Sequence, residues 1–262
     1  MDRKQLHTFV VLAYKESPYL EACIKSVLQN QSSQIMIATT TDNKFIRNLA
    51  KKYDIKVITG KHTNIGGDFD FAVNTANTPL VTVAHQDDIY EKNFVKQVIN
   101  QYQSHPDATI IFTDYFEIRN NKRIYRNTNL KIKRILLLPL ALKNVAKSQF
   151  LKRSALRFGN AICCPSVTFV KPNCPKKIFY SKLKCNIDWQ GWERLSKRKG
   201  KFIYIPRPLM GHRISEMSTT TDIINQGIRT KEDFELFQLF WPKFIARILT
   251  KAYKQSEKSN TL

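Results

Sequence analysis

Short apolar runs rich in β-branched residues alternate with segments of helical periodicity along the first 112 residues. The runs are typical of buried strands, and the segments between them place apolar residues on one helical face. Strands are expected at residues 8–13, 34–39, 55–59, 80–84, 108–112 and 202–205, and helices at residues 19–29, 43–53, 68–77 and 92–102. This alternation, with short connections, predicts an α/β fold with a mostly parallel sheet covered by helices on both faces.

One predicted strand ends in two adjacent carboxylates. The run Leu80–Ala84 is followed by His85, Gln86, Asp87 and Asp88. Open α/β sheets bind ligands at the carboxyl ends of their strands, and neighbouring carboxylates repel each other unless a cation is near. Such oxygen ligands suit Mg²⁺ or Mn²⁺, which often bridge to substrate phosphates. For an isolated pair a simple polar turn is the more frequent explanation, so the interpretation depends on the surrounding residues.

The chain is strongly basic, with 43 Lys and Arg residues against 21 Asp and Glu residues and a formal charge of +22. This excess indicates an anionic partner: nucleic acid, a membrane surface or phosphorylated substrates. Between Glu117 and Asp188 there are 17 basic residues and no acidic one. Within this interval, residues 132–143 interleave bases with leucines and isoleucines, as in segments that lie on anionic lipid. Few aromatic residues are available there for base stacking, so we expect a membrane rather than nucleic acid.

The C-terminal residues 231–256 repeat apolar side chains at intervals of three and four, which predicts helix with a break at Trp241-Pro242. Their basic, amphipathic tail either packs on the core or contacts a membrane. The longest apolar run, Ile135–Leu142, is far shorter than the roughly 20 residues that span a bilayer. No signal peptide is recognised, and the five cysteines form no disulfide pattern. We expect a cytoplasmic protein at the inner face of the cell membrane.

Three ordered segments carry a family resemblance: Val10–Glu16, Leu20–Gln31 and Asn64–Asp88. Together they resemble the family 2 glycosyltransferases of bacterial cell-surface polysaccharide synthesis, most closely over the first 115 residues. The resemblance implies a GT-A fold, with a Rossmann-like, mostly parallel central sheet, to which this chain adds a C-terminal helical extension. Residues 1–118 are then the nucleotide-sugar-binding half, residues 119–225 the acceptor-binding half with the basic segment, and residues 226–262 the amphipathic basic helices.

The resemblance further implies a nucleotide-diphosphate sugar donor, with Mg²⁺ or Mn²⁺ holding its diphosphate. Asp87 corresponds to the last carboxylate of the family's D-x-D motif, and Asp88 follows it as a further metal ligand, whereas His85 replaces the first carboxylate. The acidic pair that the family usually has after the second strand is reduced to Asp42. The nucleotide of the donor is therefore left open between UDP-sugars and dTDP-sugars. The residues expected to bind the donor are Ala13, Tyr14, Glu16, Thr40, Thr41, Asp42, Gly66, Asp70, His85, Asp87 and Arg213.

Asp188 resembles the catalytic base of the family's E-D motif, and Glu193 is the rival candidate. Inverting transfer requires one carboxylate that accepts the proton of the acceptor hydroxyl. An Asp at this position could instead cap a helix. His212 and Arg213 follow a predicted strand, where the resemblance implies a loop that closes over the diphosphate, with His212 as a metal or phosphate ligand. A surface location is the alternative for this pair.

The resulting prediction is an inverting hexosyltransferase that moves a sugar to a hydroxyl of a glycan or lipid-linked acceptor. A nucleotidyltransferase is the enzymatic alternative, although the loop after the first strand lacks the glycine-rich character of that class. A basic nucleic-acid-binding protein without catalytic activity is the second alternative. The sequence does not predict the oligomeric state.

Overall fold

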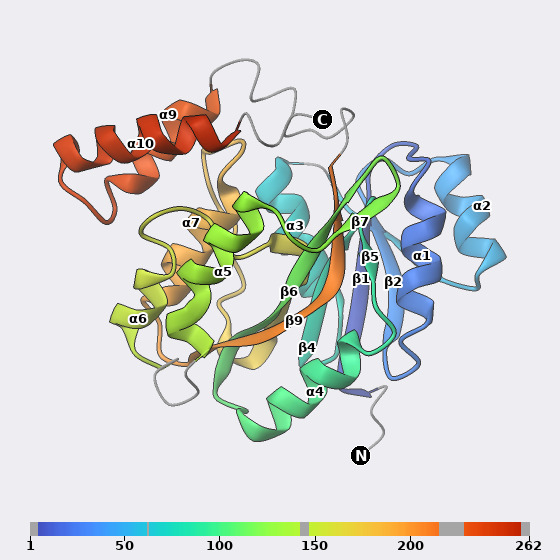
Figure 1. Cartoon of the computed structure of the whole chain (residues 1–262). Coiled ribbons are helices and arrows are strands. Elements are labelled where there is room, and N and C mark those ends of the chain that lie inside the picture. The colour runs from blue at the N-terminus through green and yellow to red at the C-terminus, as the bar shows by residue number, and fades with distance from the viewer. Residues whose placement is uncertain (1–4, 62, 142–146, 215–227, 258–262) are drawn as a thin grey trace.

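The computed structural model describes residues 5–61, 63–141, 147–214 and 228–257 (Figure 1). Its centre is a nine-stranded sheet with the order β3-β2-β1-β4-β8-β6-β9-β5, and β7 pairs with β6 outside this path. The first four strands of this order are all parallel to one another. They are β1 (His7–Ala13), β2 (Gln34–Thr39), β3 (Lys56–Thr59) and β4 (Leu80–His85).

The second half of the sheet is mixed. β8 (Val167–Val170) runs antiparallel to both β4 and β6 (Ala108–Arg119). β6 pairs in parallel with β9 (Lys201–Arg213) along almost its whole length. Two short strands complete the sheet: β5 (Ile89–Tyr90) pairs with β9 and β7 (Lys122–Ile124) pairs with β6.

Helices cover both faces of the sheet and bury two separate apolar clusters. Phe9, Val11 and Ala13 of β1 contribute to one cluster, and Val10 between them contributes to the other, as the alternation of a strand requires. The first cluster includes side chains of α1 (Leu20–Leu28), α2 (Lys44–Lys52) and α4 (Phe94–Ser104). The second includes side chains of α3 (Ile65–Thr75), α5 (Thr128–Ala141), α7 (Ile187–Ser196), α9 (Ile228–Phe237) and α10 (Lys243–Glu257).

The C-terminal helices α9 and α10 lie beside the end of the molecule that holds α7 (Figure 1). Phe237 of α9 packs edge-on against the fully buried Trp189 of α7, with ring centroids 5.1 Å apart. The predicted break at Trp241-Pro242 is confirmed, because α9 ends at Phe237 and α10 begins at Lys243. One side of the extension therefore packs on the core, while Phe244 and Ile248 of α10 are each 65% exposed.

The predicted α/β fold with helices on both faces is confirmed, with differences at element ends. Helix α3 begins at Ile65 rather than residue 68, because the Asn64 side chain accepts a hydrogen bond from the Gly67 backbone N–H and caps it. β6 and β9 continue past the predicted ends because they pair with each other. β8 was not predicted. Leu142, Lys143 and the end of the C-terminal tail lie outside the described residues.

Candidate active site

The carboxyl ends of β1, β2 and β4 meet at one edge of the sheet, because these strands are parallel and adjacent. The side-chain amide of Gln86, just after β4, forms two 3.0 Å hydrogen bonds with the backbone N–H and C=O of Tyr14. The next backbone N–H, that of Lys15, donates to Thr41 Oγ1 after β2. Lys15 also has a left-handed backbone with φ of 53°, which is an uncommon conformation for a non-glycine residue. The three loops are thus tied together by side-chain contacts.

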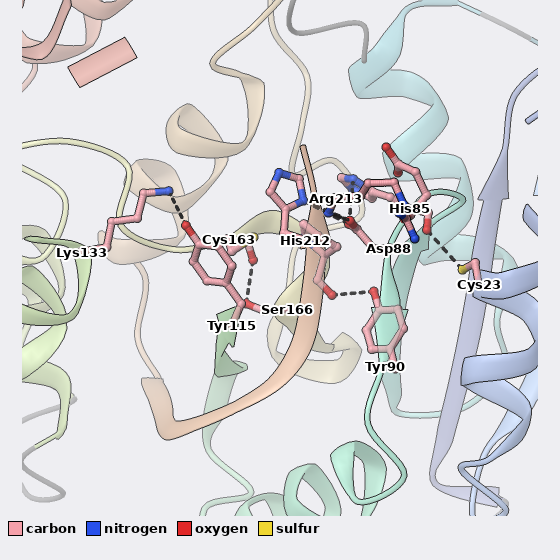
Figure 2. A network of polar contacts seen from close by, with 12 residues as sticks. Cys23, His85, Asp88, Tyr90, Tyr115, Lys133, Cys163, Ser166, His212 and Arg213 are labelled. Carbon is pink, nitrogen blue, oxygen red and sulfur yellow. Dashed lines mark hydrogen bonds and ion pairs between the residues drawn. The ribbon is translucent and has the colours of Figure 1, made fainter. Parts of the chain in front are cut away.

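Asp88 is the centre of the polar contacts at this edge, and its side chain is completely buried (Figure 2). Its Oδ1 atom accepts a hydrogen bond from the Arg213 backbone N–H at 2.9 Å and lies 3.1 Å from His212 Nδ1. The His85 ring lies on the other side, with Nδ1 3.9 Å from Asp88 Oδ2. One carboxylate therefore joins the end of β4 to the end of β9.

His85, Asp87 and Asp88 each offer a ligand atom, and these atoms lie within 4.8 Å of one another. The Nε2 atom of His85 is buried and has no hydrogen-bond partner among the described residues. Burial, reinforced by the charge of Asp88, raises the pKa of Asp87, whereas burial lowers the pKa of His85. A neutral imidazole and two carboxylates crowded together are a donor set that fits Mg²⁺ or Mn²⁺. These three residues are the candidate metal ligands.

His212 lies next to this group rather than within it. Burial opposes protonation of its ring, but the charge of Asp88 and the hydrogen bond to it outweigh burial and raise the pKa of His212. Arg213 stacks on Tyr19, with its guanidinium carbon 4.2 Å from the ring centroid, and its Nε donates to the backbone carbonyl of Asp87. Both residues of the predicted pair therefore lie at the candidate metal group and not on a remote surface.

Asp188 lies in the first turn of α7, after the N-cap residue Asn186, so it is not the helix cap. Its carboxylate accepts hydrogen bonds from the Asn160 side chain at 2.7 Å and from the Trp189 backbone N–H at 2.8 Å. Burial nevertheless raises the pKa of Asp188. Glu193, five residues further along α7, is nearly fully buried and forms ion pairs with Arg153 and Lys197. Asp188 thus has a raised pKa and no ion pair among the described residues, while Glu193 is paired with two cations.

The turn at Cys163 and Cys164 connects the two acidic regions. Burial raises the pKa of both thiols, and the charges of Asp88 and Asp188 raise them further. Asn160, three residues before Cys163, donates to Asp188, and the hydroxyl of Tyr90, two residues after Asp88, donates to the Pro165 carbonyl. The segment from residue 160 to residue 165 therefore contacts both the candidate base and the strand that follows the candidate metal ligands.

Several predicted donor residues are engaged in contacts within the protein. Asp42 forms a two-point ion pair with Arg47, at 2.8 and 2.6 Å. Thr40 Oγ1 donates to Asp68 at 3.3 Å. Ala13 is the buried last residue of β1, and Tyr14 and Glu16 are exposed in the loop that follows. All of these residues lie around the edge formed by β1 and β2.

Gly66 and Asp70, also predicted to bind the donor, connect α3 to a distant loop. A Cβ atom at Gly66 would lie 2.1 Å from the backbone oxygen of Phe179, so only glycine fits there. Asp70 accepts hydrogen bonds from the backbone N–H groups of Ile178 and Phe179. These contacts give both residues a structural role in holding the loop against α3.

Four residues at the site are absent from the sequence prediction: Gln86, Tyr115, Lys133 and Asn160. Gln86 could have been recognised, because it lies within the motif that begins at His85. The other three come from β6, from α5 and from a loop, and only the tertiary fold brings them to the edge of the sheet. No local pattern distinguishes Lys133 and Asn160 from other polar residues in the basic interval, or Tyr115 from other aromatic residues of a buried strand.

Solved structures with a similar fold include two that hold a nucleotide sugar. The S. aureus TarS 1-349 structure in complex with UDP-GlcNAc has a TM-score of 0.61 and 10% sequence identity, over 94% of this chain and 70% of that chain. The mannosyltransferase PcManGT from Pyrobaculum calidifontis, in complex with GDP-Man and Mn²⁺, has a TM-score of 0.57 and 10% identity, over 95% and 69%. At such low identity the likeness establishes the fold alone, which is GT-A.

A match between the sequence and a family model establishes the family. Residues 8–171, more than half of the chain, match the model of glycosyl transferase family 2. The chain therefore belongs to this family and is a glycosyltransferase. A comparison with curated proteins found no match. Family membership favours sugar transfer over the nucleotidyl-transfer and nucleic-acid-binding alternatives.

Proposed function

We propose that this protein transfers a sugar from a UDP- or dTDP-sugar to a hydroxyl group of a glycan or lipid-linked acceptor, with inversion at the sugar C1 atom. The observation that carries this proposal is that residues 160–165 contact Asp188 through Asn160 and, through Pro165, the strand that follows the cluster of His85, Asp87 and Asp88. One group is suited to hold the donor, and the other is suited to activate the acceptor.

The donor lies across the ends of β1, β2 and β4 in this proposal, where the Gln86 amide holds the Tyr14 loop in place. His85, Asp87 and Asp88 would hold Mg²⁺ or Mn²⁺, and Mn²⁺ is present in the similar PcManGT structure. When bound, such a cation supplies positive charge that stabilises the leaving diphosphate. Arg213 lies beside this group, and a guanidinium is suited to contact phosphate oxygens.

Asp188 acts as the general base. The acceptor oxygen forms a bond to C1 from the side opposite the diphosphate, the bond from C1 to the diphosphate oxygen breaks, and the hydroxyl proton passes to the Asp188 carboxylate. The raised pKa of Asp188 makes it a stronger base than an exposed aspartate. The ion pairs of Glu193 with Arg153 and Lys197 leave it poorly suited to this role.

Peripheral binding to an anionic membrane, at its inner face, is part of the proposal and would place the enzyme where cell-surface polysaccharide is assembled. Helix α5 exposes Ile132, Ile135 and Leu138, which lie three residues apart and are 48%, 62% and 59% exposed. Phe150 of the neighbouring α6 (Gln149–Ser154) is 69% exposed. Among the described helices, none combines the length and the apolar character that crossing a bilayer requires. An apolar stripe on a basic chain suits the surface of an anionic bilayer.

A vesicle-binding measurement tests the membrane component. The variant Ile135→Gln with Leu138→Gln is compared with the wild type on phosphatidylcholine vesicles with and without phosphatidylglycerol. We expect the double variant to lose about tenfold or more in affinity for the anionic vesicles, since two apolar side chains no longer insert. The control is Leu28→Gln, on α1, which is also partly exposed at 37%. Equal binding of all three proteins would contradict membrane docking through α5.

The donor class is tested by a thermal-shift screen of UDP-, dTDP- and GDP-sugars, each with and without Mn²⁺. A ligand present at a hundredfold excess over its dissociation constant stabilises the folded protein by about 2.7 kcal/mol. We expect stabilisation by UDP- or dTDP-sugars, and only with the metal. Stabilisation by GDP-sugars alone would contradict the proposed donor, and stabilisation by none of them would contradict the proposed function.

A further inference from the structure

Helix α5 directs one lysine toward the site. Lys133 is half-buried, and its ammonium donates a 2.9 Å hydrogen bond to the Tyr115 hydroxyl while lying 5.2 Å from the centroid of that ring. Tyr115 is buried in β6, and its ring meets that of His212 edge-on, with centroids 6.2 Å apart. Figure 2 shows Lys133, Tyr115, His212 and Asp88 following one another across the site.

Unlike Arg134 and Arg119, Lys133 has no acidic partner among the described residues. Arg134, the next residue, forms an ion pair with Asp114 at 2.7 Å, and Arg119 forms one with Glu117 at 2.8 Å. Among the described residues, no carboxylate lies within 4.0 Å of the Lys133 ammonium. A partly desolvated cation without a counter-ion is unfavourable. An anion from outside the chain would remove this cost.

The contacts of Tyr115 locate the charge of Lys133. The Tyr115 hydroxyl accepts from the ammonium, and the Tyr115 ring meets His212, which lies 3.1 Å from Asp88. Lys133 also lowers the pKa of the Cys163 thiol, against the larger effect of burial. In Figure 2, the Tyr115 ring lies between Lys133 and the candidate metal group, so Lys133 is on the side away from the metal ligands.

We propose that Lys133 and Tyr115 bind an anionic group, a phosphate or carboxylate, carried by the acceptor. The Lys133 ammonium supplies the positive charge, and the Tyr115 hydroxyl, which accepts from Lys133, donates its own hydrogen to the anion. This inference rests on the proposed function, because it takes the side of the site away from the metal ligands as the acceptor side. It narrows the acceptor to the charged members of the glycan and lipid-linked classes.

The test compares glycerol 3-phosphate with glycerol as probes, in the presence of UDP and Mn²⁺, by isothermal titration calorimetry. We expect the wild-type protein to prefer the phosphorylated probe, and Lys133→Met to reduce this preference about tenfold, as expected for one charge-assisted hydrogen bond. Lys133→Arg should retain most of the preference, and Tyr115→Phe should lose part of it. The matched control is Lys131→Met, because Lys131 is exposed on the same helix.

Two results would overturn the inference. One is equal affinity of the wild-type protein for both probes, or equal loss in Lys133→Met and Lys131→Met, which would mean that only overall charge matters. The other is a tenfold loss of UDP affinity in Lys133→Met, which would assign the ammonium to the donor diphosphate. If the wild type binds the phosphorylated probe through Lys133 but binds no nucleotide with Mn²⁺, the proposed function is wrong. The binding of an anion by Lys133 is then still supported.

Discussion

The carboxylate of Asp88 accepts a hydrogen bond from the backbone N–H of Arg213, so the end of β4 is joined to the end of β9 across 125 residues of sequence. The same oxygen lies 3.1 Å from His212 Nδ1. Asp88 is thus a structural link between two halves of the sheet in addition to being a candidate metal ligand. The structural role of Asp88 can be measured apart from its role as a metal ligand, because the link to β9 stabilises the fold even when no metal is bound.

Replacement of Asp88 by alanine should destabilise the fold even in the absence of metal. The Arg213 backbone N–H would lose its acceptor in a partly buried position, which costs about 1–3 kcal/mol. The free energy of unfolding from urea titration, measured with EDTA present, checks this. Asp87→Ala is the control, since Asp87 is only partly buried and holds no such link; an equal loss in both variants would contradict the structural role of Asp88.

Replacement of Asp188 by asparagine should abolish sugar transfer while leaving donor binding intact. The amide keeps the shape of the side chain but cannot accept the hydroxyl proton. Turnover of the sugar nucleotide found by the screen should fall by roughly 10²-fold or more, as for loss of a general base, with unchanged affinity for UDP and Mn²⁺. An inactive Glu193→Gln beside an active Asp188→Asn would show that Glu193 is the base.

The turnover rate should fall at acidic pH with an apparent pKa above that of an ordinary aspartate. Burial raises the pKa of Asp188, and only its deprotonated form accepts a proton, so activity is lost as pH falls through that raised value. The hydrogen bond from Asn160 favours the carboxylate. Asn160→Ala should therefore move the acidic limb of the pH–rate profile to higher pH; a shift to lower pH would contradict this assignment.

Folding stability should also depend on pH through His7, far from the site. His7 is fully buried in β1 and hydrogen-bonded to Ser33 and Thr82, and burial lowers its pKa to about 3. The unfolded chain binds the proton below pH 6.5 while the folded protein does not, so stability decreases between pH 6.5 and about 3. The loss attributable to His7 between pH 7 and 5 is about 2 kcal/mol. Urea titrations of the wild type and His7→Gln check this, since the variant should depend less on pH; equal slopes would contradict it.

The parts of the site that the sequence predicted are those in which strand and motif are adjacent in the chain. The strand at Leu80–Ala84 is regular, and the residues at its end follow from its length and from the rule that ligands bind there. Asn160, Tyr115 and Lys133 reach the site through contacts between elements far apart in the sequence. β8 was not predicted because its apolar run has only four residues, between the 3₁₀ turns Cys164–Ser166 and Lys171–Asn173. Helix, strand and motif are local properties, whereas the pairing of Asp88 with β9 is not.

We propose His85, Asp87 and Asp88 as the ligands of a divalent cation that contacts the diphosphate of a sugar nucleotide. Isothermal titration calorimetry of UDP into the wild type and Asp87→Asn, each with Mn²⁺ and with EDTA, measures whether the metal and Asp87 contribute to donor binding. We predict that the wild type binds UDP tightly only with Mn²⁺, and that Asp87→Asn stays folded but loses this metal-dependent gain. Identical, metal-independent binding by both proteins would rule out this metal site.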